Sequence, residues 1–322
     1  MPFRFPFRSV SFPRFLRRFA GLLPPLALAL GLFAGSAQAE PLRVVTSFSI
    51  LADLARQVGG PRVNVHALVE RDGDAHVYQP TPADARSLAQ ASLVVVNGLG
   101  FEGWLDRLVK SSGYRGKVIV ASRGITPLRR PGHDHGHARK HGHDHDGDAD
   151  PHAWQDAANV LRYVDNIAQA LAELDPAGQA DYVANAARYK EKVATLDAEI
   201  RQTFQALPPA QRRVVTTHDA FAYFGKAYGI RFISPVGVST DAEASAADVA
   251  RIIRQVRKER IPAVFIENVS DSRLLERIRQ ESGARLGGTL YSDSLSGDAG
   301  PAPTYLEMMR HNARALAAAI AQ

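Results

Sequence analysis

Residues 42–69, with the sequence LRVVTSFSILADLARQVGGPRVNVHALV, decide the fold class of this chain. The apolar run at 42–47 predicts a buried strand, and apolar residues spaced three and four apart at 50–58 predict a helix. The helix is expected to end at Gly59-Gly60, because glycine readily adopts the conformation that closes a helix. Val63–Val69 predicts a second strand. A strand, a helix and a strand in succession are typical of two parallel strands joined by a crossover helix.

The same alternation continues along most of the chain. Further strands are predicted at 93–97, 117–121, 214–217, 231–233, 263–266 and 285–289. Helices are predicted after Thr81-Pro82 and at 101–110, 157–174, 221–228, 246–258, 271–282 and 303–319. This order of elements predicts an α/β fold in which helices cover both faces of parallel sheets.

The second half of the chain repeats the first. Val44-Val45-Thr46-Ser47 aligns with Val214-Val215-Thr216-Thr217, and the same offset places 93–96 on 263–266. We therefore expect two similar lobes, each a mainly parallel sheet flanked by helices. Ligands of such sheets bind beyond the carboxyl ends of the strands, so the expected binding site is a cleft between the lobes.

A long helical pattern lies between the two halves. Apolar residues three and four apart run from Tyr182 to Phe204, inside an expected helix at 177–207. Such a helix is about 45 Å long, which is more than one lobe needs, and we expect it to be a rigid spine that joins the lobes. The expected domains are an N-terminal lobe at 40–156, linking helices including the spine at 157–210, and a C-terminal lobe at 211–322.

The first 39 residues predict a cleaved signal peptide. They contain five arginines and no acidic residue, then an apolar stretch, and they end in Ala37-Gln38-Ala39, a small-residue cleavage site before Glu40. These arginines account for most of the net charge of +6, so bulk charge gives no support for a nucleic-acid partner. The chain contains no cysteine, which excludes disulfides, thiolate metal sites and a lipobox anchor. We expect a periplasmic protein that is not lipidated.

One segment is unusually rich in histidine. Six of the eleven histidines are His133, His135, His137, His141, His143 and His145. Aspartates and glycines separate them, so this segment cannot bury a core and a disordered loop is predicted at 132–149. Imidazoles and carboxylates at this density favour weak binding of zinc, copper or nickel. The alternative is a solvated spacer.

Four other residues are candidates for a defined metal site, because each lies just beyond a predicted strand or at a predicted strand-to-helix junction. They are His76, His152, His218 and Asp293. Three imidazoles and one carboxylate suit zinc and are tolerable for manganese. Taken singly, each would also suit a helix cap or a hydrogen-bonded core residue. Glu267 ends a strand beside the expected cleft, where it would either support a metal ligand or only hold a loop, and His66 and His311 are assigned structural roles.

Several segments resemble the solute-binding proteins of zinc/manganese ABC transporters, the cluster A-I metal-binding family. The similar segments are DAHVYQPTP (74–82), DPHAW (150–154), HDAFAYF (218–224) and YSDSL (291–295). The resemblance covers essentially all of the chain after residue 39, and it implies that His76, His152, His218 and Asp293 are the four metal ligands. Manganese-type members tend to have Glu where His218 stands, and zinc-type members often carry a His-rich loop. The chain departs from the family at Ala75 and Ala157, where proline is common.

The resemblance implies a periplasmic zinc receptor, not an enzyme, that carries Zn²⁺ as its ligand to a membrane permease driven by a cytoplasmic ATPase. A monomer is expected, with a periplasmic metallochaperone as a further partner. One alternative is a manganese or iron receptor of the same family. Another is a zinc-dependent hydrolase, which four protein ligands and the absence of an H-E-x-x-H helix argue against. A third is an adhesin or a metal-storage protein.

Overall fold

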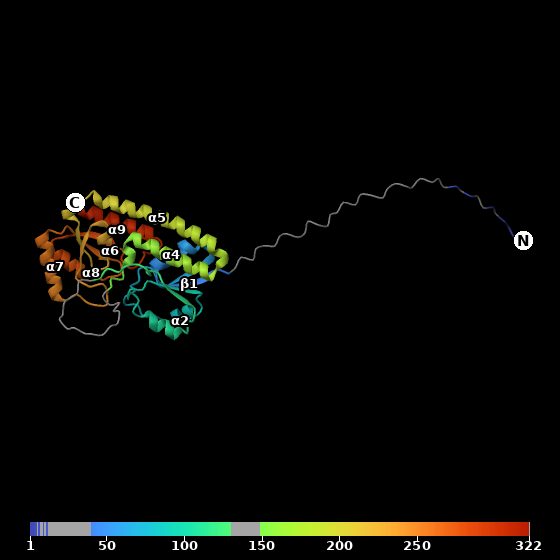
Figure 1. Ribbon diagram of the computed structural model, residues 1–322, viewed down its shortest axis with the longest axis horizontal. Coiled ribbons are helices and arrows are strands. Elements are labelled where there is room, and N and C mark those ends of the chain that lie inside the picture. Colours follow the sequence, from blue (N-terminus) through green and yellow to red (C-terminus); the bar gives the residue numbers. More distant parts are fainter. Residues whose placement is uncertain (5, 7–8, 10, 12–39, 130–148, 322) are drawn as a thin grey trace. The chain divides into compact units, whose positions relative to one another are not determined.

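The computed structural model describes residues 1–4, 6, 9, 11, 40–129 and 149–321. Met1–Ala39 and Glu40–Gln322 are separate units, and the second contains every helix and strand of the described residues (Figure 1). None of the described helices is both long enough and apolar enough to span a membrane. The cleavage site predicted before Glu40 and the predicted His-rich loop, apart from Ala149, lie outside the described residues.

The N-terminal lobe is built on four parallel strands in the order β2-β1-β3-β4. The strands are β1 (Leu42–Phe48), β2 (Val63–Val69), β3 (Leu93–Val96) and β4 (Lys117–Val120). The helices are α1 (Ser49–Gly59), α2 (Pro82–Ala89), α3 (Leu105–Ser112) and α4 (Ala157–Leu174). The inner strand β3 is buried along its whole length, as its unbroken apolar sequence predicts.

The C-terminal lobe repeats this topology, with four parallel strands in the order β6-β5-β7-β8. The strands are β5 (Arg213–Val215), β6 (Arg231–Ile233), β7 (Ala263–Glu267) and β8 (Arg285–Leu290). The helices are α6 (Ala222–Tyr228), α7 (Ala246–Glu259), α8 (Ser272–Ser282) and α9 (Tyr305–Ile320). The prediction of two similar α/β lobes is confirmed.

Several elements differ from the prediction by a few residues at their ends, and in two of them a glutamate side chain explains the difference. Helix α3 begins at Leu105 and not at residue 101, because the Glu102 carboxylate accepts hydrogen bonds from the backbone N–H groups of Asn97 and Gly98 and holds a turn there. Strand β5 ends at Val215 and not at residue 217, since the N–H of Thr217 donates to the Glu267 side chain.

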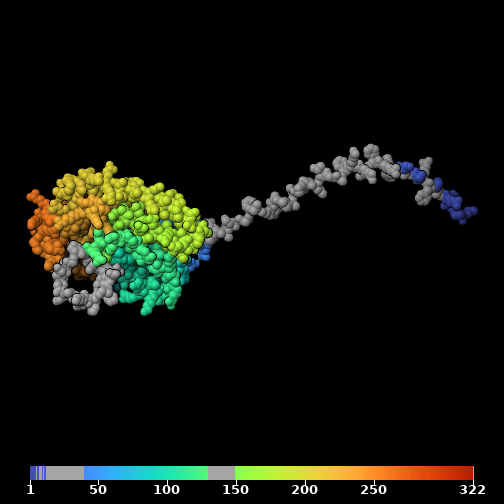
Figure 2. Space-filling view, in the orientation of Figure 1, coloured from blue at the N-terminus to red at the C-terminus, as the bar shows by residue number. Residues whose placement is uncertain are grey.

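The predicted spine is α5 (Gln179–Gln205), a helix of 27 residues that is about 40 Å long. Its buried residues follow the predicted spacing of three and four and are Tyr182, Ala186, Tyr189, Val193, Leu196, Ile200 and Phe204. The helix packs on α1 and α4 of the N-terminal lobe and on α6 and α9 of the C-terminal lobe, and Figures 1 and 2 show it running along both. One hydrophobic core therefore continues from lobe to lobe, which limits how far the lobes can separate.

Candidate metal centre

Two of the candidate ligands are each held by a short turn of the same type. His76 follows Asp74 in the loop after β2, and His152 follows Asp150 just before a 3-10 turn at Ala153–Gln155. In each case the aspartate two residues earlier accepts a hydrogen bond from the backbone N–H of the histidine, at 2.9 Å. This side-chain-to-backbone bond is a common turn of aspartate, and it fixes the backbone that presents each imidazole.

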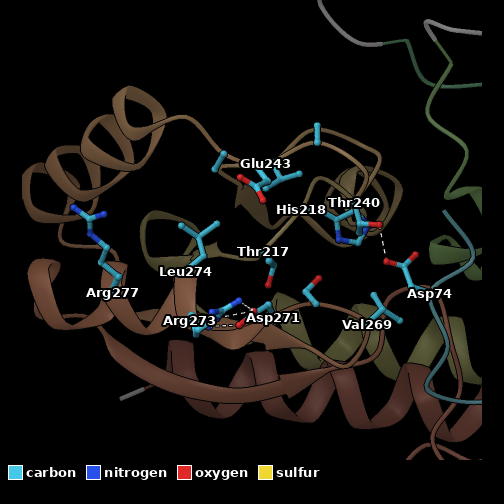
Figure 3. A pocket seen from close by; sticks show the side chains of 14 residues that line it. Asp74, Thr217, His218, Thr240, Glu243, Val269, Asp271, Arg273, Leu274 and Arg277 are labelled. Atoms are coloured by element: carbon cyan, nitrogen blue, oxygen red, sulfur yellow. Dashed lines mark hydrogen bonds and ion pairs between the residues drawn. The ribbon is translucent and has the colours of Figure 1, made fainter. Parts of the chain in front are cut away.

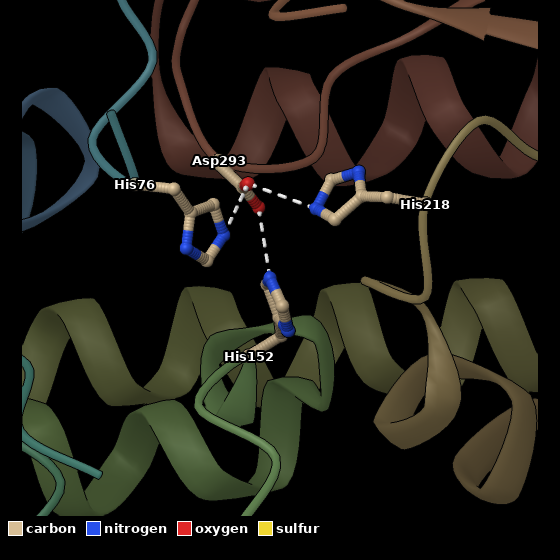
Figure 4. Close-up of side chains that lie close together, drawn as sticks. All are labelled: His76, His152, His218 and Asp293. Atoms are coloured by element: carbon tan, nitrogen blue, oxygen red, sulfur yellow. Dashed lines mark ion pairs between the residues drawn. The ribbon is translucent and has the colours of Figure 1, made fainter. Parts of the chain in front are cut away.

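The structure brings all four candidate residues together between the lobes (Figure 4). Their ligand atoms lie within 4.8 Å of one another. The Asp293 carboxylate is at the centre: Oδ2 is 3.3 Å from His76 Nε2 and 3.1 Å from His218 Nε2. The other oxygen, Oδ1, is 3.4 Å from His152 Nε2. His76 and His152 belong to the N-terminal lobe and His218 and Asp293 to the C-terminal lobe, so each lobe contributes two donors.

The chemistry of these donors fits a small cation. The side chains of His152 and Asp293 are 0% exposed, His218 is 1% exposed and His76 is 4% exposed. The three Nε2 atoms and both Asp293 oxygens are buried without a hydrogen-bond partner among the described residues. Buried polar atoms without partners are costly, and a cation among them would satisfy all four side chains. Three nitrogen donors and one oxygen donor make a four-coordinate site.

The buried groups of this cluster shift one another's pKa values. Burial alone lowers the pKa of His152, but the carboxylates of Asp293 and Asp150 outweigh it and raise this pKa from 6.5 to about 9. Burial of His218 is likewise outweighed by Glu267 and Asp293, and its pKa lies well above the ordinary value. Burial raises the pKa of Asp293, but the charged rings of His152 and His218 hold it well below its ordinary value. A metal must displace these protons.

Sequence comparison places the chain among metal-uptake proteins. Residues 44–319 match the family described as "Zinc-uptake complex component A periplasmic". The chain belongs to this family. Two relatives are the iron-binding protein YfeA of Yersinia pestis, 35% identical over 90% of this chain and 89% of the relative, and the manganese-binding lipoprotein MntA of Halalkalibacterium halodurans, 33% identical over 89% and 91%.

Solved structures of metal-binding proteins share this architecture. The periplasmic zinc-binding protein TroA of Treponema pallidum has a TM-score of 0.78 and 28% identity, over 88% of this chain and all of TroA. A manganese-bound periplasmic metal-binding protein of Candidatus Liberibacter asiaticus has a TM-score of 0.75 and 29% identity, over 87% and 99%. As a member of the zinc-uptake component A family, the chain is a metal-binding periplasmic receptor of an ABC transporter. The proteins of this family are substrate-binding proteins, not enzymes.

In this family member, two of the three imidazoles are supported by buried carboxylates. His152 Nδ1 is 2.8 Å from Asp150 Oδ1, and His218 Nδ1 is 2.7 Å from Glu267 Oε2. Such a carboxylate fixes the tautomer, so that Nε2 is the nitrogen free to bind a metal. Glu267 thus lies where the sequence suggested a supporting residue. Asp150 was missed, although its place two residues before His152 was a usable signal.

Aromatic residues enclose the cluster and tie its loops together. The Trp154 indole donates a hydrogen bond to the Ser292 carbonyl, which joins the His152 turn to the loop of Asp293. The Trp104 indole donates to the carbonyl of Ala75. This bond holds the backbone of the His76 loop at Ala75. Sequence reasoning missed both tryptophans as parts of the site.

The six loop histidines lie outside the described residues. They are His133, His135, His137, His141, His143 and His145. The flanking residues Arg129 and Ala149 pair in an antiparallel bridge, and the N–H of Asp150 donates to the carbonyl of Leu128. The two ends of the His-rich segment are therefore fastened to each other next to the His152 turn.

Proposed function

We propose that this receptor captures one Zn²⁺ through His76, His152, His218 and Asp293 and delivers it to the membrane permease of its transporter. The observation that carries the proposal is the buried group of three Nε2 atoms around one carboxylate, with two donors from each lobe. A metal bound there links the lobes, and its release separates the donors. The permease, with its cytoplasmic ATPase, is the partner that would receive the ion.

Zinc is favoured over manganese by the donor set. Zinc accepts four ligands of mixed nitrogen and oxygen type, whereas manganese favours more oxygen donors. Zinc also lies above manganese in the general affinity order of divalent metals. The relatives named for iron and manganese make a receptor for either metal the second candidate. A hydrolase is disfavoured, because four protein donors leave no open position for a catalytic water.

We also propose that residues 1–39 are removed as a signal peptide and that the protein works in the periplasm as a monomer without a lipid anchor. The sequence contains no cysteine, although relatives are named lipoproteins. The mass of protein recovered from the periplasm tests this proposal. A mass larger than that of unmodified 40–322 contradicts it.

Deleting residues 132–147 is expected to leave one tight zinc site and to remove only weaker binding. The four proposed ligands lie outside the deleted segment, and the Arg129–Ala149 bridge already brings its two ends together. Calorimetric titration of the deleted and full-length proteins with zinc provides the measurement, and competition with manganese on the deleted protein then tests the metal. Loss of the tight site contradicts the ligand assignment. Displacement of zinc by manganese at equal concentration contradicts the choice of zinc.

Replacing His218 by glutamate is expected to favour manganese only when Glu267 is also changed. In H218E alone the new carboxylate faces the Glu267 carboxylate, whose Oε2 is 2.7 Å from His218 Nδ1, and like charges repel. H218E should therefore bind both metals poorly. Glu267→Gln keeps an amide oxygen to accept the backbone bonds from Thr217 and His218.

The double variant H218E/E267Q is thus expected to recover manganese binding by about tenfold relative to H218E, because it gains an oxygen donor without the repulsion. Competition titrations of the two variants and of E267Q alone give the measurement. Equal manganese affinities of H218E and the double variant would show that Glu267 has no part in metal selection.

A further inference from the structure

The segment that carries His76 is fastened to the C-terminal lobe at Asp72. The backbone N–H of Asp72 donates to the Leu295 carbonyl at 2.9 Å. Its carboxylate accepts hydrogen bonds from the Asn268 side chain at 3.0 Å and from the Gly297 N–H at 3.1 Å. These contacts tie the His76 segment to the loop that carries Asp293.

A second, separate tie lies at Asp74. One of its carboxylate oxygens, Oδ1, accepts the hydrogen bond from the His76 backbone, and the other, Oδ2, accepts a hydrogen bond from the Thr240 hydroxyl at 2.6 Å (Figure 3). Thr240 belongs to the C-terminal lobe, in the loop between β6 and α7. The same loop is joined to the residue that follows His218, because the Asp219 N–H donates to the Gly237 carbonyl. A single chain of contacts therefore connects His76 with the residue next to His218.

The β6–α7 loop also lines two cavities that reach the metal centre. One, of about 510 Å³, is lined by Asp74, Thr217, His218 and Thr240. The other, of about 410 Å³, is lined by His76 and by residues of the β6–α7 loop, including Ser239. Among the four candidate ligands, His76 is the most exposed. A metal that leaves through the second cavity must pass His76.

His76 differs from the other two imidazoles in how it is held. Carboxylates lie within 2.8 Å of Nδ1 in both His152 and His218. In the part of the chain that the structure describes, no hydrogen bond reaches His76 Nδ1. The position of this imidazole therefore depends on its contact with the Phe101 ring and on its backbone, which Asp74 and the Trp104–Ala75 bond hold.

We propose that Asp74 and Thr240 form an interlobe latch that positions His76 and sets how fast the bound metal leaves. The latch rests on the proposed metal site. When the Thr240 hydroxyl bonds to Asp74, the carboxylate is fixed from the opposite lobe and the His76 backbone with it. When the bond breaks, the His76 segment can turn away from Asp293, and the metal loses one donor on the side of the second cavity.

The test is the rate of zinc release from the zinc-loaded protein lacking residues 132–147, measured by stopped flow after mixing with excess EDTA. Thr240→Val keeps the shape of the side chain and removes the hydroxyl. It is expected to raise the dissociation rate about tenfold, as for loss of a hydrogen bond to a charged group. The association rate should change less than twofold, because such variants act mainly on dissociation.

Thr240→Ser keeps the hydroxyl and is expected to restore slow release, which a role in packing alone would not explain. Thr195→Val, the same change at an exposed position of α5, is the matched control and should release zinc at the parent rate. If the parent binds zinc tightly and Thr240→Val releases zinc at the parent rate, the latch is wrong and the proposed function is unaffected. Absence of tight zinc binding by the parent overturns the proposed function and the latch together.

Discussion

His152→Ala is expected to weaken zinc binding at the tight site by about 100-fold or more. The binding free energy of zinc at structural sites is about 10–16 kcal/mol. Divided among four ligands, this is roughly 3 kcal/mol for each ligand, so loss of one ligand corresponds to about 100-fold in affinity. The His152 side chain is 0% exposed, so water has little room to replace its nitrogen. The change also leaves the buried Asp150 carboxylate without its ring partner, which lowers the stability of the fold.

The measurement is a competition titration with a chelator of known zinc affinity, on the protein that lacks residues 132–147. His66→Ala is the matched control, because His66 is an exposed histidine on β2 and its loss should change zinc affinity less than twofold, as for a surface substitution. Thermal unfolding of the metal-free variants shows whether the fold is kept. Zinc affinity of H152A close to that of the parent would remove His152 from the site.

Zinc affinity is expected to fall steeply as the pH is lowered below about 9. The pKa of His152 is raised to about 9 and that of His218 also lies above its ordinary value, so both rings carry protons at pH 7 in the metal-free protein. Zinc binds the unprotonated ring, and each ion therefore releases about two protons at pH 7. Two released protons lower the affinity by about 100-fold between pH 8 and pH 7.

Calorimetric titration in buffers with different ionisation enthalpies counts the released protons directly. Repeating it at several values of pH gives the slope of the affinity. His152→Ala serves as an internal check, because it should release about one proton fewer than the parent. An enthalpy of binding that does not depend on the buffer would contradict the protonated state of the metal-free cluster.

The elements of the fold could be predicted because their signals are local. Thr81 followed by Pro82 predicted the start of α2, and the structure has Thr81 as its cap with Pro82 as the first residue of the helix. The apolar spacing from Tyr182 to Phe204 predicted the buried face of α5. Each signal depends on a few neighbouring residues and on the geometry of one helix, so no knowledge of distant contacts was needed.

The candidate donors could be selected for a related reason. His218 follows β5 and Asp293 follows β8 of the same sheet, and the carboxyl ends of parallel strands meet at one edge of a sheet. Predicted strands therefore indicated which polar residues share the cleft. Periodicity alone did not identify Asp150 or Trp154 as residues of the site, because their roles depend on contacts with His152 and Ser292.

The sequence by itself determined the α/β class, the repeated lobes, the spine helix and the choice of four candidate metal ligands. Only the tertiary structure decided how these residues act on one another. The distances of 3.1–3.4 Å between Asp293 and three imidazoles arise from loops that are far apart in the sequence. The bond between Thr240 and Asp74 joins residues 166 positions apart. Periodicity reports which face of an element is buried, whereas such contacts exist only after the two lobes have packed on a common core.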